Sequence, residues 1–414
     1  MSRNTILMTG LLVVIGLAIS LNAAATTVSV KFCTKWKAHF VDDDVGEDDA
    51  DPDDYEYRPA MFSKYYILIA STNGLIQQGY LDGSGCTPFV TLESGTSYKF
   101  MQGTFMRVTG DRMIYVNPTS VAPPQTGTTW VSSYYTPSSW PSSQMKVFQP
   151  NWNAPQSNIM AAAANALKYY NSREFPADFS IQIWPGDFVT SAGGPGQVLI
   201  DINHLYKGVY IDQSQYKFVV CHEIGHTLAR ESGAPYFIDD NAQSDTCTSV
   251  AKCNCSQLAG SPSMCIQSRE YIKTAEMEAW AYFYSTALFN NQETDCFFGY
   301  WHEMYTGSTP QSATIDQYPP VTVDCSDMPK WQDNLCPADD KGVLQDWLGF
   351  YWNVWTNGPY KYTVDEMSDV YSRPEVSDDL YWDELVAAVI AKYPSDPDKR
   401  DQFIDMGALA GVNY

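Results

Sequence analysis

Residues 216–230 read Tyr-Lys-Phe-Val-Val-Cys-His-Glu-Ile-Gly-His-Thr-Leu-Ala-Arg, and this stretch decides how the rest of the chain is interpreted. Apolar residues flank its polar centre on both sides, as expected for a buried helix. His222 and His226 are four residues apart, so they lie one turn apart on the same face of that helix. Two imidazole nitrogens at this spacing can bind a single metal ion.

Glu223 directly follows the first histidine and projects from the edge of the same face. Its carboxylate can therefore take a proton from a water molecule on the metal without being a ligand. The alternative is a helix that carries two histidines for packing. Against that alternative, the chain has only five histidines in 414 residues, and Gly225 is small enough for another backbone to come close.

The HEIGH pattern of residues 222–226 resembles the HExxH motif of the zincin metallopeptidases. The resemblance implies a hydrolase in which His222 and His226 bind Zn²⁺ and Glu223 is the general base. It covers roughly residues 155–290.

The third metal ligand separates the branches of that family. Ala229 and Ser232 stand where the metzincin branch has glycine and histidine, which excludes that branch. In the gluzincin branch the third ligand is a glutamate on a later helix, and residues 272–285 are expected to form that helix. A third ligand at Asp239 or Asp240, as in aspartate-type zincins, is an alternative, but the glycine-threonine-aspartate context of that type is missing.

Two glutamates compete for the role of third ligand. Glu276 and Glu278 are two residues apart, so they lie on nearly opposite faces of a helix. The face of Glu278 carries small residues that would allow a close approach to Gly225, whereas the face of Glu276 is bulky. We therefore expect Glu278 to be the ligand, in agreement with the E-x-x-A pattern of gluzincins. Tyr282 stands where some gluzincins have an acidic residue, and its hydroxyl can accept a hydrogen bond but carries no charge.

Residues 1–25 have the features of a signal peptide: Arg3 near the terminus, an apolar run from Ile6 to Leu21, and small residues at 22–25. The apolar run is short for a membrane span. We expect a protein that is secreted or held in the cell envelope, without stable membrane insertion after cleavage. An uncleaved anchor is the alternative.

Ten cysteines in an exported chain favour disulfide bonds, and sequence alone leaves their pairing open. Cys33 and Cys86 bracket the N-terminal region, and four more cysteines crowd residues 247–265. A zinc site at Cys253 and Cys255 is the alternative, but their spacing is wrong for a zinc knuckle.

The net charge is −23 and the isoelectric point is about 4.4, which excludes nucleic acid and anionic membrane surfaces as natural partners. Much of the acidic excess lies in residues 42–54. Asp42, Asp44 and Asp48 alternate as in calcium-binding loops, so a Ca²⁺ site is one interpretation. A solvated loop is the other.

The fold class expected is multidomain: an N-terminal β-sandwich, then an α+β zincin-like catalytic domain with a largely helical C-terminal lobe. Residues 26–116 alternate apolar and polar positions between turn signals, as strands of a sandwich do. They loosely resemble transthyretin-like or carboxypeptidase-regulatory domains. Residues 117–157 are expected to be a surface connection, residues 158–290 the catalytic core and residues 291–414 the helical lobe.

The function expected is that of a secreted zinc endopeptidase acting on a peptide or protein substrate. By the resemblance, an edge strand within residues 180–202 would pair with the extended substrate. The remaining histidines, His204 and His302, are expected to be surface or core residues, although His302 could donate to a substrate oxyanion. The rival function is a non-catalytic binding or surface protein with a structural metal.

Overall fold

The computed structural model describes residues 26–41, 56–108, 111–170, 178–188, 191–194, 196–206, 209–231, 266, 269–290, 292, 297–300, 321–324, 341–371 and 381–413. The predicted signal peptide, the acidic run at 42–54 and the cysteines at 247–265 lie outside these residues. So do Asp239, Asp240 and His302.

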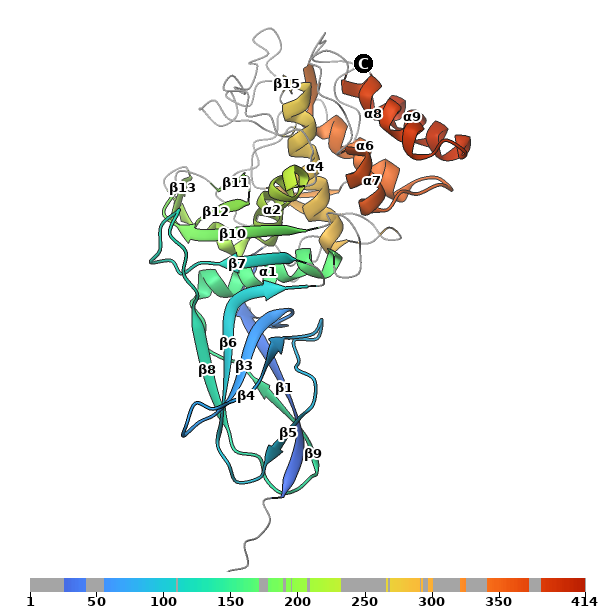
Figure 1. Ribbon diagram of the computed structural model, residues 1–414. Coiled ribbons are helices and arrows are strands. Elements are labelled where there is room, and N and C mark those ends of the chain that lie inside the picture. Colours follow the sequence, from blue (N-terminus) through green and yellow to red (C-terminus); the bar gives the residue numbers. More distant parts are fainter. Residues whose placement is uncertain are drawn as a thin grey trace, which may run out of the picture.

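The N-terminal part of the chain is a β-sandwich made of two sheets (Figure 1). In the first sheet β1 is the central strand, paired antiparallel with β2 and β5 and parallel with β9. These strands are β1 (Thr27–Ala38), β2 (Glu56–Pro59), β5 (Val90–Glu93) and β9 (Ser143–Phe148). Inward-facing side chains alternate along β1, so Phe32 packs against Phe100 and Phe148 at centroid distances of 5.4 and 5.8 Å, and these two rings also contact each other at 5.4 Å. These rings form the centre of the sandwich core.

The second sheet runs through both halves of the molecule. Its strand order is β11-β12-β10-β7-β6-β3-β4, and β8 also pairs with β6. Its strands are β3 (Ser63–Ile69), β4 (Leu75–Tyr80), β6 (Tyr98–Arg107), β7 (Arg112–Val116), β8 (Trp130–Tyr135), β10 (Phe179–Gly186), β11 (Ala192–Gly194) and β12 (Gln197–Asp201). The pairs β7-β10 and β10-β12 are parallel, whereas β11 is antiparallel to β12.

The long strand β6 joins the sandwich to the part of the molecule that carries the helices. It pairs with β3 along most of its length and with β8 in its first half, and its last residues pair with β7, which in turn pairs with β10. The segment 117–157, expected to be a surface connection, thus contributes β8 and β9 to the sandwich. Its composition, rich in Pro, Ser and Thr, did not indicate these two strands. The strands with which they pair are far away in the sequence.

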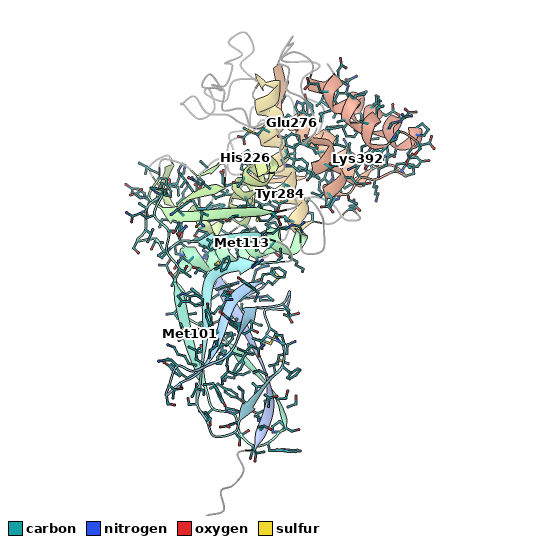
Figure 2. All side chains as sticks on the ribbon, viewed as in Figure 1. Met101, Met113, His226, Glu276, Tyr284 and Lys392 are labelled. Atoms are coloured by element: carbon teal, nitrogen blue, oxygen red, sulfur yellow. A yellow bond between two sulfur atoms is a disulfide. The ribbon has the colours of Figure 1, made fainter. Side chains whose placement is uncertain are left out.

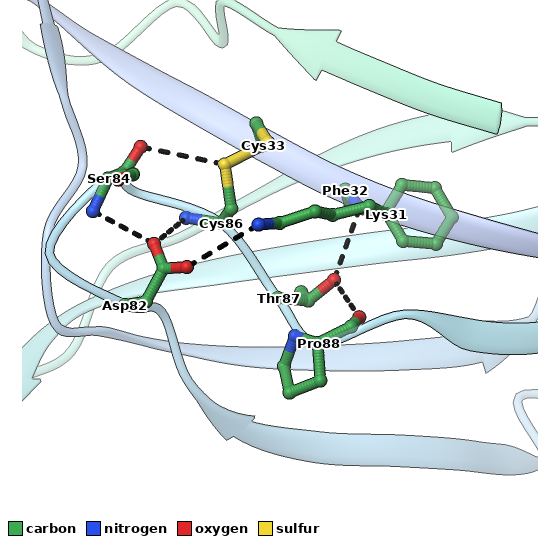
Figure 3. Close-up of a disulfide and its surroundings, with 8 residues drawn as sticks. All are labelled: Lys31, Phe32, Cys33, Asp82, Ser84, Cys86, Thr87 and Pro88. Atoms are coloured by element: carbon green, nitrogen blue, oxygen red, sulfur yellow. Dashed lines mark hydrogen bonds and ion pairs between the residues drawn. A yellow bond between two sulfur atoms is a disulfide. The ribbon is translucent and has the colours of Figure 1, made fainter.

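A disulfide bond joins Cys33 of β1 to Cys86, which lies between β4 and β5 (Figure 3). The turn before Cys86 is ordered by Asp82, whose Oδ1 accepts hydrogen bonds from the backbone N–H groups of Ser84 and Cys86 at 2.8 and 2.9 Å. The other carboxylate oxygen lies 3.6 Å from Lys31 Nζ. The disulfide therefore ties β1 to a turn that already has a defined conformation.

Seven α-helices are present among the described residues, and all follow the sandwich in the sequence. They are α1 (Ala154–Tyr170), α2 (Lys217–Glu231), α4 (Ile272–Phe289), α6 (Leu344–Thr356), α7 (Val364–Tyr371), α8 (Tyr381–Lys392) and α9 (Pro397–Ala410). A short 3-10 helix, η1 (Gln213–Gln215), precedes α2. Short two-stranded pairs complete the fold: β13 (His204–Tyr206) with β14 (Val209–Ile211), β15 (Arg269–Tyr271) with β18 (Lys341–Val343), and β16 (Phe297–Tyr300) with β17 (Val321–Asp324).

Helix α1 lies between the sandwich and the other helices. Its alanines at 161–164 are buried, and such small side chains allow close packing against β1, β7 and α2. At its start, Ser157 Oγ donates to the carbonyl of Lys37, and Asn158 Oδ1 accepts from the backbone N–H of His39. These bonds fix the helix to the end of β1.

The C-terminal helices pack on α4 through aromatic side chains. Trp280 and Phe283 of α4 contact Tyr351 of α6, and Trp280 also stacks on Tyr371 of α7 at 5.1 Å. Mixed sheets with a sandwich-like N-terminal part and a helical C-terminal part agree with the multidomain layout that was expected. No described helix combines the length and hydrophobicity needed to cross a bilayer.

Candidate metal centre

Helix α2 carries two histidines whose ring nitrogens converge. The helix is buried from Lys217 to Ala229, and His222 and His226 are each only 6% exposed. Their Nε2 atoms lie 3.0 Å apart. Because one turn of helix separates the residues, both rings extend to the same side, toward α4.

Helix α4 approaches α2 closely because Gly225 has no side chain. A Cβ at Gly225 would lie 3.2 Å from Cα of Ala281 and 3.0 Å from a ring carbon of Tyr284. Figure 2 shows His226 and Tyr284 where α2 and α4 meet. The small residues of both helices thus produce the close approach expected from the sequence.

Glu278 of α4 completes a triangle with the two histidines. Its Oε2 lies 3.2 Å from Nε2 of His222 and 3.4 Å from Nε2 of His226. Two ligands of a tetrahedral zinc ion at about 2.0–2.2 Å are about 3.3 Å from each other, so the three edges of the triangle match such a centre. Among the described residues, His222, His226 and Glu278 form a group that could hold a metal ion.

The protonation of His222 and of Glu278 suits a cation site, whereas the carboxylates around His226 favour its protonated form. Burial lowers the pKa of His222 to about 4, so this ring is neutral at pH 7 and can be a ligand. Burial also acts to lower the pKa of His226, but the carboxylates of Glu278 and Glu223 raise it overall. Burial alone would raise the pKa of Glu278. The two histidines have the larger effect and hold this pKa well below its usual range. Glu278 is thus ionised and can bind a cation.

Glu223 lies beside the triangle but is not part of it. It is 6% exposed, and burial raises its pKa to about 7. The charge of His226 lowers this pKa, as does a hydrogen bond from the backbone N–H of Gly193. The charge of Glu278 raises it further. A carboxylate that titrates near neutral pH is suited to accept and return a proton.

Glu276, the competing candidate, lies on the other side of α4. It is 1% exposed, and it accepts hydrogen bonds from the hydroxyls of Tyr351 and Tyr371. Glu276 therefore links α4 to α6 and α7, and it is not in the group with the histidines.

The outer nitrogens of the two histidines differ from the usual arrangement in metal sites. Metal-binding histidines normally donate their second ring N–H to an acceptor. Nδ1 of His222 and Nδ1 of His226 have no hydrogen-bond partner within the described parts of the chain. Tyr282, at the position where an acidic residue occurs in some gluzincins, contacts the ring of His222 at a centroid distance of 4.1 Å, with the two ring planes tilted by 48°. Among the described residues, packing against Tyr282 and the contact of Nε2 with Glu278 orient this ring.

Other side chains named from the sequence lie elsewhere. His204 is on β13, and its Nδ1 lies 3.2 Å from the buried carboxylate of Asp201. Cys221 is buried, with its sulfur 3.5 Å from the carbonyl oxygen of Ala162. The proposed calcium ligands Asp42, Asp44 and Asp48 fall outside the described residues.

Two contacts of the site were not expected from the sequence. The first is the hydrogen bond from the backbone N–H of Gly193 to Glu223. The second is the pair of hydrogen bonds that Tyr351 and Tyr371 donate to Glu276. The sequence Gly193-Gly194 does signal an unusual backbone approach, but nothing in it names the partner.

Comparison of the chain with protein-family models and with curated proteins gave no match. The interpretation of this centre therefore depends on its geometry and on the resemblance of its motif.

Proposed function

We propose that this protein is a zinc-dependent hydrolase of peptide bonds that resembles the gluzincin metallopeptidases. The observation that supports the proposal best is the joint placement of three ligand atoms and one acid. His222, His226 and Glu278 supply two nitrogens and an oxygen to one point, and Glu223 lies next to them, buried and outside the ligand set.

Zinc fits the donor set better than the other common divalent ions. Two imidazoles and one carboxylate are the ligands of many catalytic zinc sites, whereas Ca²⁺ and Mg²⁺ prefer oxygen ligands only. Three protein ligands also leave one position of a tetrahedral ion for water or substrate. When bound, zinc would supply Lewis-acid chemistry by lowering the pKa of water and polarising a peptide carbonyl.

Glu223 would carry the proton during hydrolysis. Its carboxylate would accept a proton from the attacking water and return it to the leaving amine nitrogen. Two opposing effects support both halves of this role: burial of the carboxylate favours its protonated form, and the charge of a bound Zn²⁺ would favour its ionised form. Glu278, with its depressed pKa, would stay ionised throughout and hold the metal.

The substrate would be an extended peptide. Among the described strands, β11 is at the edge of the second sheet, and it lies against α2 near Glu223. An exposed strand edge can pair with an extended peptide through backbone hydrogen bonds. This arrangement supports the expectation of an edge strand within residues 180–202.

Export of the protein is part of the proposal. It is based on residues 1–25, and the disulfide between Cys33 and Cys86 supports an oxidising compartment. The second candidate function is a non-catalytic binding protein in which the metal is structural. A buried glutamate beside the metal ligands favours the hydrolase, because a structural site has no need of a base.

The test uses the full chain loaded with zinc and the variant Glu223→Gln. We expect the wild-type protein to cleave a denatured protein mixture and a chelator to stop the cleavage. Glu223→Gln should keep one bound zinc and lose at least about 100-fold in kcat, because general-base catalysis contributes 10²–10⁴-fold. Zinc binding without cleavage in the wild type would favour the binding protein, and loss of zinc in the variant would contradict the role of Glu223.

A further inference from the structure

Strand β11 comes unusually close to the backbone of the proposed base. A Cβ at Gly193 would lie 2.2 Å from the carbonyl oxygen of Glu223 and 3.0 Å from Cβ of His226. The first distance is far shorter than any van der Waals contact. Strand β11 can therefore take this place only with glycine at position 193. Gly193 does not have a positive φ angle. Glycine is therefore needed at this position for its small size and not for its backbone conformation.

The close approach gives the backbone N–H of Gly193 a direct partner. This N–H donates a hydrogen bond to the Glu223 carboxylate. A backbone donor on a strand is a fixed group, so it can hold a carboxylate in a single orientation at little entropic cost. Side-chain donors would need to be ordered first.

Strand β11 is itself held in position at both sides of Gly193. Before it, the buried Ser191 donates through Oγ to Gln213 of η1 and accepts from the backbone N–H of Asp201. After it, Thr227 of α2 lies with its Oγ1 3.2 Å from the carbonyl oxygens of both Gln197 and Glu223. The edge of the sheet and helix α2 are therefore fixed to each other next to the base.

We infer that Gly193 is a positioning residue for Glu223: its backbone N–H orients the carboxylate of the base, and its missing side chain allows the strand to come near enough. The inference rests on the proposed role of Glu223 as the base. Gly193 acts through Glu223 and contributes nothing to the binding of the metal.

The chain provides a matched control at the next residue. A Cβ at Gly194 would lie 4.0 Å from the carbonyl oxygen of Gln197, in ordinary contact. Gly193→Ala and Gly194→Ala thus make the same chemical change in the same strand, but only the first displaces the strand from Glu223. Each variant is prepared in full length and loaded with zinc, and kcat, KM, zinc content and melting temperature are measured.

We expect Gly193→Ala to keep its zinc and to lose about tenfold or more in kcat, as a misplaced general base does, with a smaller change in KM. Gly194→Ala should lose far less in kcat than Gly193→Ala, and any effect that it has on the substrate-binding edge should appear in KM. In a Glu223→Gln background, Gly193→Ala should cause no further loss, because the group it positions is already absent. Equal effects of the two alanine variants, or an additive loss in the double variant, would overturn the inference. Loss of zinc in Gly193→Ala would also overturn it and assign Gly193 to the support of His226.

A second variant covers the case in which Gly193→Ala does not fold. Exchange of the Gly193 amide for an ester, by incorporation of glycolic acid, removes the N–H and adds no Cβ. The same fall in kcat is expected, and unchanged kcat would reject the inference while leaving the proposed function intact. Failure of the proposed function is recognised separately, because the wild-type protein would then show no cleavage.

Discussion

Glu278 and Glu276 are two residues apart on α4, yet only Glu278 lies within 3.4 Å of a histidine nitrogen of α2. Glu276 instead accepts hydrogen bonds from Tyr351 and Tyr371. One helix thus uses one acid for the candidate metal centre and another for packing, because side chains two apart face opposite sides.

This difference predicts opposite effects of two alanine substitutions. Glu278→Ala should remove most of the bound zinc, because only two protein ligands would remain. Glu276→Ala should retain zinc but unfold at a lower temperature, since two buried tyrosine hydroxyls lose their acceptor at a cost of about 1–3 kcal/mol each. Zinc analysis after gel filtration and thermal melting check both. Loss of zinc from Glu276→Ala but not from Glu278→Ala would instead identify Glu276 as the third ligand.

Zinc should stabilise the folded protein, because its ligands come from two helices and converge only in the folded state. At a free zinc concentration 1,000-fold above Kd, the free energy of unfolding should rise by about 4 kcal/mol. The measurement is the melting temperature of chelator-treated protein with and without added zinc. His226→Ala serves as the control, and a similar rise in that variant would mean that zinc acts elsewhere.

The contact between Glu366 and Lys399 predicts a pH dependence of stability. Burial acts to raise the pKa of Glu366, but Lys399, the N–H of Thr363 and the hydroxyl of Tyr393 hold it below its ordinary value. A depressed carboxyl pKa stabilises the fold fully above the unfolded pKa of about 4.3, and the gain is lost as pH falls through the folded pKa.

Glu366→Gln should therefore lower the free energy of unfolding by about 1 kcal/mol at pH 7. The difference from wild type should shrink as pH falls below about 4. Urea unfolding followed by fluorescence at several pH values measures it. Asp401→Asn removes a charge from an exposed position of the neighbouring helix α9 and is the control. A difference that stays constant down to pH 2 would contradict the assignment.

The disulfide between Cys33 and Cys86 spans 53 residues of sequence, and a loop of this length predicts up to about 4 kcal/mol of stabilisation. The double variant Cys33→Ser and Cys86→Ser should melt at a lower temperature than wild type under non-reducing conditions. With a reductant present the two proteins should melt alike. A persistent difference in reductant would assign the loss to the serine side chains.

Several helices were predictable from local patterns alone. Residues 216–230 and 272–285 were expected as helices, and α2 and α4 contain nearly all of them. Helix α7 was not expected, although Thr363 and Glu366 form a reciprocal capping box that the sequence displays. Helix α9 has an N-terminal signal as well, with Asp396 accepting from the N–H of Lys399 and Pro397 at the first turn.

Strands β8 and β9 were not predictable in the same way. Strand β9 is parallel to β1 and β8 is antiparallel to β6, so each partner lies at least 27 residues away and no local pattern encodes the pairing. The same reason applies to the boundary between the expected domains, which the second sheet crosses where β7 pairs with β10.

The sequence by itself determined the two histidines and Glu223 as candidates, because residues on one helix have a relative placement set by the helical repeat. It also favoured Glu278 over Glu276 through the size of neighbouring side chains. Only the tertiary structure decided that Glu278 reaches the histidines, that Glu276 is held by Tyr351 and Tyr371, and that the N–H of Gly193 meets Glu223. These contacts join segments far apart in the chain, and their distances depend on how closely the helices and the edge strand pack.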